Sequence, residues 1–203
     1  MSRRVLVTAF EPFGGDTVNP TIAALEALRS TVDGGELPGV GLTGRVLPVE
    51  FERAQQQISE LITETDPHAV ICLGLAGGRT RVTPERLAVN LMDARIPDNA
   101  GTQPTDEPVV PDGPAAYFST LPVKAMVDAL TEAQVPAEVS MTAGTYVCNT
   151  VLYRVLHSLA CTSTHTGAIP AGFIHVPHPD VMDQETINRA VQVCVRTVTD
   201  QLS

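Results

Sequence analysis

The chain has 203 residues, of which 43% are hydrophobic and 18% are charged, values that fit a globular protein and exclude a disordered one. Its formal net charge of −10 argues against nucleic acid or an anionic membrane surface as a partner, because phosphate groups would repel it. No apolar run approaches the roughly 20 residues of a membrane-spanning helix, and no signal-peptide pattern follows the basic start. We therefore expect a cytoplasmic protein.

Strand-like and helix-like segments alternate along the chain. The sequence predicts strands at 5–10, 44–49, 69–75, 87–92, 138–142 and 172–176, and helices at 20–29, 51–63, 122–133, 149–159 and 184–202. Strands separated by helices imply right-handed crossovers and an α/β fold, with a mostly parallel sheet covered on both faces. Ligands of such sheets gather at the carboxyl ends of the strands.

Two features modify this simple alternation. Residues 96–122 are rich in Pro, Gly and Asp and are predicted to form a long structured loop, which in a compact domain is usually functional or an interface. The four cysteines are widely spaced, without a CxxC pair, so we expect free thiols in a reducing compartment. These cysteines are Cys72, Cys148, Cys161 and Cys194.

Cys148 is the candidate nucleophile. It stands where a helix is predicted to begin, and the positive end of the helix dipole together with unpaired N–H groups favours a thiolate there. The same N–H groups could hold an oxyanion. The alternative is that Cys148 is a small apolar residue packed under the helix.

A cysteine nucleophile needs a base and an orienting carboxylate. His175 is predicted at the carboxyl end of a buried strand, with His178 three residues later in a Pro-flanked loop. The other histidines, His68, His157 and His165, are weaker candidates. The candidate carboxylates are Glu85, Asp93 and Asp98, and the residues alone do not choose between them.

Cofactor motifs are missing from the sequence. It has neither a GxGxxG nor a GxxxxGK[ST] pattern, which argues against a nucleotide cofactor. His175, His178 and Asp180 could in principle hold a metal ion, but two intervening prolines forbid the helical spacing that zinc sites of the HExxH type use. We therefore predict no metal and no cofactor.

Four blocks of sequence carry a resemblance. They are VLVTAFEPFGG with Asn19-Pro20 at 5–20, the stretch 74–101 with ERLAVN and DARIPDN, AGTYVCN at 143–149, and GFIHVP at 172–177. In this order, and over nearly the whole chain, they resemble the pyroglutamyl peptidase I family of cysteine exopeptidases. One departure is His178, where the family usually has tyrosine.

The resemblance implies a fold, an activity and a catalytic triad. The fold is a single catalytic domain over residues 1–203, a three-layer α/β/α sandwich around a twisted sheet. The activity is removal of an N-terminal pyroglutamyl (5-oxoproline) residue from peptides through a thioester, and the implied triad is Glu85, Cys148 and His175.

The resemblance also implies a substrate site and an assembly. Phe10 and Phe13 match aromatic residues that hold the pyroglutamyl ring, Asn19 matches a polar residue near the site, and Arg95 matches an arginine close to the cysteine. Family members usually form homotetramers in the cytosol, so we expect a homotetramer or a homodimer. On this reading, Phe10→Ala and Phe13→Ala raise KM more than they lower stability. Two rival hypotheses are a metal-dependent hydrolase and a binding module that has lost the chemistry.

Overall fold

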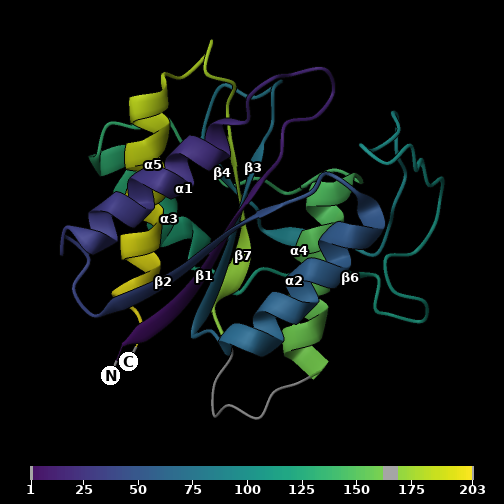
Figure 1. Ribbon diagram of the computed structural model, residues 1–203, viewed down its shortest axis with the longest axis horizontal. Helices are drawn as coiled ribbons and strands as arrows, with labels where there is room; N and C mark the ends of the chain where they lie inside the picture. The colour runs from purple at the N-terminus through teal and green to yellow at the C-terminus, as the bar shows by residue number, and fades with distance from the viewer. Residues whose placement is uncertain (1, 162–168, 203) are drawn as a thin grey trace.

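The computed structural model describes residues 2–161 and 169–202, and a five-stranded sheet lies at its centre (Figure 1). The strands lie in the order β2 (Val40–Leu47), β1 (Arg3–Phe10), β3 (Ala69–Leu75), β7 (Ala171–Val176) and β4 (Thr83–Pro84). The first four are parallel, and the short β4 is antiparallel to β7. The predicted mostly parallel sheet is therefore confirmed.

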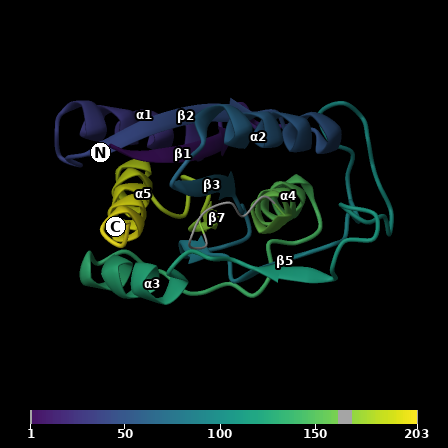
Figure 2. The same ribbon diagram turned by 90° about the horizontal axis from the view of Figure 1, so that it is seen from below.

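Helices cover both faces of this sheet, as Figure 2 shows with the sheet seen edge-on. On one face lie α1 (Pro20–Asp33), α3 (Val123–Glu132) and α5 (Gln184–Thr199), and on the other lie α2 (Phe51–Thr65) and α4 (Val147–Cys161). This arrangement confirms the three-layer α/β/α sandwich. Within the described residues, no helix combines the length and the hydrophobicity that crossing a membrane requires.

The central strands are apolar at nearly every position because both of their faces are buried. In β1, Val5 and Val7 belong to the core formed with α1, α3 and α5, whereas Leu6 and Phe10 belong to the core formed with α2 and α4. Successive side chains of a strand point to opposite faces, which produces this division. Every residue of β3 is buried, and its observed bounds are those that the sequence predicts.

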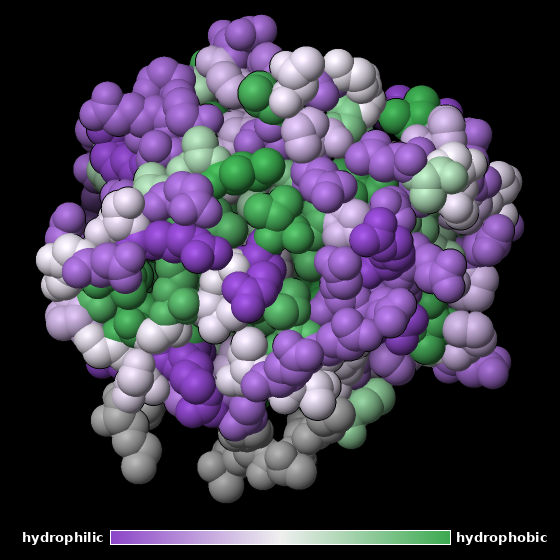
Figure 3. Space-filling model, in the orientation of Figure 1, coloured by the Kyte–Doolittle hydropathy of each residue, from purple (hydrophilic) through white to green (hydrophobic). Residues whose placement is uncertain are grey.

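The edge strand β2 is less buried and less regular in sequence. It begins at Val40, before the predicted 44–49, because glycines at 41 and 44 hide the strand pattern although the register with β1 continues through them. Val46 on this strand is 39% exposed. On the face that carries α1, β2 and α2, Figure 3 shows hydrophobic residues between hydrophilic ones near the centre.

The predicted strand at 138–142 is wrong. This segment lies beside β4 and forms only isolated bridges, Val82 with Ala137 and Glu85 with Ser140. The N–H of Ser140 donates to Pro84 O at 3.0 Å, but Pro84 has no N–H to continue the ladder on its other side. Because the nitrogen of Pro84 cannot donate a hydrogen bond, the pairing of this segment with β4 is interrupted and no regular sixth strand forms.

The predicted strand at 87–92 is also too long. The observed β5 is Leu87–Val89, and it pairs with β6 (Ala116–Phe118), which lies inside the predicted loop at 96–122. The predicted helices are present with shifted ends. The shift that matters is that of α4, which begins at Val147, so Cys148 lies inside its first turn.

Candidate active site

His175 lies at the carboxyl edge of the sheet, next to the end of β3. Its partner in the parallel register is Gly74, and the two strands end one residue later at Leu75 and Val176. The imidazole is buried, with 4% of the residue exposed, and its ring centroid lies 4.7 Å from that of Phe173. An imidazole so poorly hydrated needs a polar partner inside the protein.

Glu85 is that partner. The antiparallel pairing of Thr83 with His175 in β4 and β7, together with Glu85 N–H donating to Phe173 O at 2.9 Å, sets its position through main-chain bonds. The carboxyl group is completely buried, and its Oε1 accepts a hydrogen bond from His175 Nδ1 at 2.7 Å. A proton held on Nδ1 leaves the lone pair of the neutral imidazole on Nε2, where it can act as a base.

The other candidate carboxylates have structural roles. Asp98 Oδ2 accepts from the N–H of Phe51 at 2.8 Å, which caps α2, and its Oδ1 accepts from the N–H groups of Ala100 and Thr102. Asp93 is exposed, and its main chain bonds to that of Thr145 at 3.0 Å. Of the three carboxylates, the structure brings Glu85 to His175.

Cys148 reaches the same edge from α4. A Cβ atom added at Gly74 would lie 3.2 Å from Cys148 Sγ and 2.6 Å from the Phe173 ring. The missing side chain of Gly74 therefore makes room for both groups. Because Gly74 is the register partner of His175, the Cys148 thiol of α4 lies over the strand position next to the imidazole.

Burial determines the charge state of this pair. Desolvation, and next the charge of Glu85, raise the pKa of Cys148 to about 12, while Arg79 and the N–H of Cys148 itself lower it by less. Desolvation also lowers the pKa of His175, against the opposing effect of Glu85. Both shifts favour a neutral thiol beside a neutral imidazole. This differs from the thiolate expected at a helix N-terminus, because the packing around the sulfur outweighs the helix dipole.

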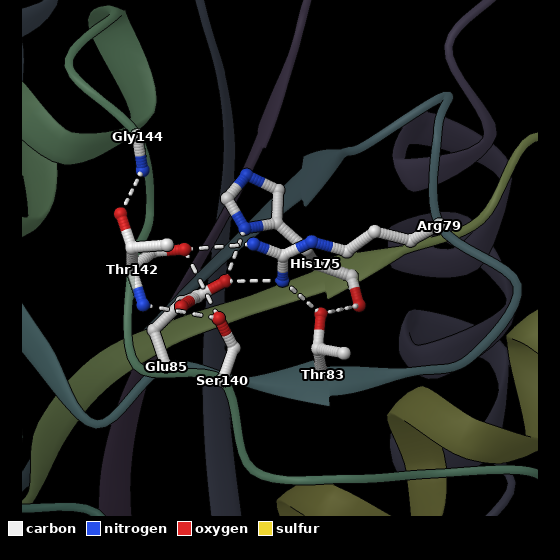
Figure 4. Close-up of polar contacts among 7 residues, drawn as sticks. All are labelled: Arg79, Thr83, Glu85, Ser140, Thr142, Gly144 and His175. Carbon is white, nitrogen blue, oxygen red and sulfur yellow. Dashed lines mark hydrogen bonds and ion pairs between the residues drawn. The ribbon is translucent and has the colours of Figure 1, made fainter.

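Arg79 was not identified as a site residue from the sequence, because an arginine after two glycines is typical of an exposed turn. Its side chain is only 25% exposed, and its Nη1 donates to Glu85 Oε1 at 2.6 Å and to Thr83 Oγ1 (Figure 4). Its Nη2 donates to Thr142 O at 2.7 Å. The signal available in the sequence is its place between the end of the most apolar strand and Glu85.

A small pocket opens beside the sulfur, with about 250 Å³ of space that includes open solvent. Its walls are mainly apolar, and the Phe13 and Tyr146 rings lie 6.1 Å apart. Tyr146 is fixed by its hydroxyl, which donates to Pro97 O at 3.0 Å. The lining residues are Phe10, Phe13, Asn19, Val49, Leu75, Tyr146, Val147 and Cys148.

The remaining site candidates are placed less directly. Asn19 lines the pocket, but its Oδ1 caps α1 by accepting from Thr21 N–H at 3.1 Å, and its Nδ2 donates to Glu11 O. Arg95 is exposed on the loop after β5. His157 bonds to the Tyr117 hydroxyl at 2.9 Å. His165 lies outside the described residues.

The possible metal ligands do not converge. His175 is engaged by Glu85, whereas His178 Nδ1 lies 3.3 Å from Asp180 Oδ2 within one short turn. Among the residues that the structure describes, no group of three or more His, Cys, Asp or Glu side chains is arranged to hold a metal ion.

A buried carboxylate–imidazole pair and a cysteine lie at one edge of the α/β/α sandwich, and the chain as a whole matches a class of peptidases. A family model described as pyroglutamyl peptidase matches residues 3–202, and the chain belongs to this family. The pyrrolidone-carboxylate peptidase of Thermococcus onnurineus is 48% identical over 96% of this chain and 98% of its own length. That of Escherichia fergusonii is 45% identical over 96% and 92%.

Solved structures agree with this assignment. A mutant pyrrolidone carboxyl peptidase from Pyrococcus furiosus superposes with a TM-score of 0.91 at 40% identity, covering 98% of this chain and all of its own. The pyroglutamyl peptidase I of Bacillus amyloliquefaciens gives 0.87 at 37% identity, covering 98% and 95%. The family resemblance and the fold class expected from the sequence are both confirmed.

Proposed function

We propose that this protein removes an N-terminal pyroglutamyl residue from peptides, with Cys148 as the nucleophile, His175 as the base and Glu85 as the orienting carboxylate. One arrangement carries the proposal: the buried Glu85–His175 pair lies beside Gly74, whose missing side chain makes room for Cys148 Sγ. Family membership supplies the substrate class.

The chemistry begins from the neutral pair. Cys148 Sγ attacks the pyroglutamyl carbonyl carbon while the thiol proton passes to His175 Nε2, so no charged thiolate has to form before the attack. N–H groups in the first turn of α4 hold the oxyanion of the tetrahedral intermediate. Glu85 stabilises the imidazolium that has formed.

The second half of the reaction releases both products. The C–N bond breaks as the imidazolium gives its proton to the leaving amine, and the pyroglutamyl group remains on Cys148 as a thioester. His175 then takes a proton from water, which attacks the thioester carbonyl. The C–S bond then breaks, the pyroglutamic acid leaves, and the imidazolium returns its proton to the Cys148 sulfur.

The pocket suits a lactam. A pyroglutamyl residue has no free α-amino group, so a charged clamp is of no use, whereas flat rings bury an apolar ring at little entropic cost. Phe10 and Phe13 supply this wall in our proposal. Asn19 also lines the pocket, and beside the N–H that donates to Glu11 O its Nδ2 has a second N–H for the substrate. Arg95 is assigned a substrate-binding role on the family resemblance alone, since its side chain is exposed.

The test is hydrolysis of a fluorogenic pyroglutamyl amide by the reduced protein. Cys148→Ser should lower kcat by about four orders of magnitude or more, with an unchanged circular-dichroism spectrum. Cys161→Ser is the matched control, because Cys161 is an exposed thiol on the same helix. No turnover by the wild-type protein would favour a binding module, and near-normal turnover by Cys148→Ser would remove Cys148 from its role.

We further propose that residues 1–203 act as one catalytic domain and assemble as a homotetramer or a homodimer in the cytoplasm. Family resemblance supports this assembly. Light scattering would measure the mass against the 21.5 kDa of one chain. A single-chain mass at every concentration would contradict the proposal.

A further inference from the structure

Arg79 connects three parts of the active site. Its guanidinium lies in the segment after β3 and donates to the side chains of Thr83 and Glu85 and to the carbonyl oxygen of Thr142. Figure 4 shows it facing Glu85 from the side opposite the loop that carries Thr142 and Gly144. The planar guanidinium of arginine, with its five donors, can bond to three partners in three directions, whereas the single ammonium group of lysine suits this arrangement less well.

The first consequence concerns charge. Glu85 Oε1 accepts from both His175 and Arg79, and the carboxylate is completely buried. A buried carboxylate without a cation is strongly disfavoured and would draw a proton onto the nearest base, which here is His175. With Arg79 present, the charge of Glu85 is balanced, so the imidazole can stay neutral and orient its Nε2 lone pair outward.

The second consequence concerns the loop before α4. Thr142 O accepts from Arg79 Nη2, and Thr142 Oγ1 accepts from the N–H of Gly144 at 3.0 Å. Gly144 has φ +78°, a left-handed conformation that glycine tolerates and other residues resist. Arg79 therefore ties the chain that leads to Cys148 to the carboxylate that orients His175.

We propose that Arg79 is a positioning residue of this reaction, which keeps His175 a neutral base by balancing Glu85 and holds the loop that presents Cys148. The inference rests on the proposed function for its consequence on turnover. Among the described residues, the charged groups that act on the imidazole are Glu85 after β4 and Arg79 after β3. The Cys148 thiol of α4 lies over Gly74, the register partner of His175. Arg79 lowers the pKa of His175, and Glu85 raises it.

The test measures the rate of alkylation of Cys148 by iodoacetamide across pH, followed by peptide mass spectrometry in a Cys161→Ser background. This readout needs no substrate, so it stands even if pyroglutamyl peptides prove not to be cleaved. In Arg79→Met, the unbalanced charge of Glu85 stabilises the imidazolium. The pH at which the alkylation rate falls on the acid side (the acid limb of the pH–rate profile) should therefore rise by about 1 pH unit. An acid limb at the wild-type pH would overturn the inference.

Two further variants separate charge from shape. Arg81→Met removes a more exposed arginine that lies 3.8 Å from Glu138, and its profile should match the wild type. Arg79→Lys keeps the charge but cannot reach all three partners, so its acid limb should stay within about 0.3 pH unit while kcat for the pyroglutamyl amide falls about tenfold or more. If Arg79→Met does not fold, a full 1-unit shift in Arg79→Lys would contradict the charge-balancing role.

Discussion

Gly74→Ala is the sharpest single perturbation of this site, because it adds one carbon where two functional groups meet. The new Cβ would lie 2.6 Å from two carbons of the Phe173 ring and 3.2 Å from Cys148 Sγ. Non-bonded carbons pack at about 3.5–4.0 Å, so the ring must move by roughly 1 Å. Phe173 has no exposed surface and lies between Phe10 and His175, with ring centroids 6.1 Å and 4.7 Å away.

The displacement has two measurable effects. Overpacking of this kind costs about 1–3 kcal/mol, which urea denaturation would report. A misplacement of about 1 Å between thiol and imidazole can cost about 100-fold, so kcat/KM for the pyroglutamyl amide should fall by that order.

The matched control is Gly77→Ala, since a Cβ at Gly77 meets nothing within 4 Å and its φ is not positive. It should leave the stability and the activity near those of the wild type. If Gly74→Ala is as stable and as active as this control, the idea that Gly74 makes room for the thiol is wrong.

Further predictions concern the carboxylates, the pH profile and the pocket. Glu85→Gln should lower kcat by about 10³- to 10⁴-fold in steady-state kinetics, because the imidazolium loses its counter-charge. The acid limb of kcat/KM should lie below the ordinary imidazole value of about 6.5, because burial lowers the pKa of His175 and only the neutral ring accepts the thiol proton; a limb above that value would contradict the assignment. Asp98→Ala should cost about 1–2 kcal/mol in urea denaturation through loss of the α2 cap, with kcat/KM reduced far less than in Glu85→Gln. Phe13→Ala should raise KM with little loss of stability. Phe10 is only 2% exposed, so Phe10→Ala should lower the free energy of unfolding by about 3–5 kcal/mol, which differs from the expectation drawn from the sequence.

The sequence was informative where one local pattern determines the structure. β3 is apolar throughout and was predicted with its observed bounds, and the five helices follow their apolar periodicity. The two-residue strand β4 has no such pattern. It exists because Thr83 and Pro84 pair with β7, which is remote in sequence: Glu85 and His175 are 90 residues apart along the chain. Pairings at that separation leave no trace in local periodicity.

The candidate site divides in the same way. The position of Cys148 near a helix start is a local property, and the structure has it there. Its pKa is raised to about 12 by burial, which depends on how remote segments pack around the sulfur. Choosing Glu85 over Asp93 and Asp98 requires its contact with His175, which lies 90 residues away along the chain. The proposed role of Arg79 depends in part on its contact with Thr142, 63 residues away.

The way Glu85 is held has a consequence for insertions and deletions. Main-chain bonds of β4, rather than packing of its side chains, aim the carboxyl group at the imidazole. A slip of one residue in this short pairing would turn the carboxyl group to the opposite side of the sheet. Loss or gain of a single codon within positions 80 to 82 should therefore be far more harmful than exchanging those three amino acids one at a time, and diversity there should arise by replacement at constant length.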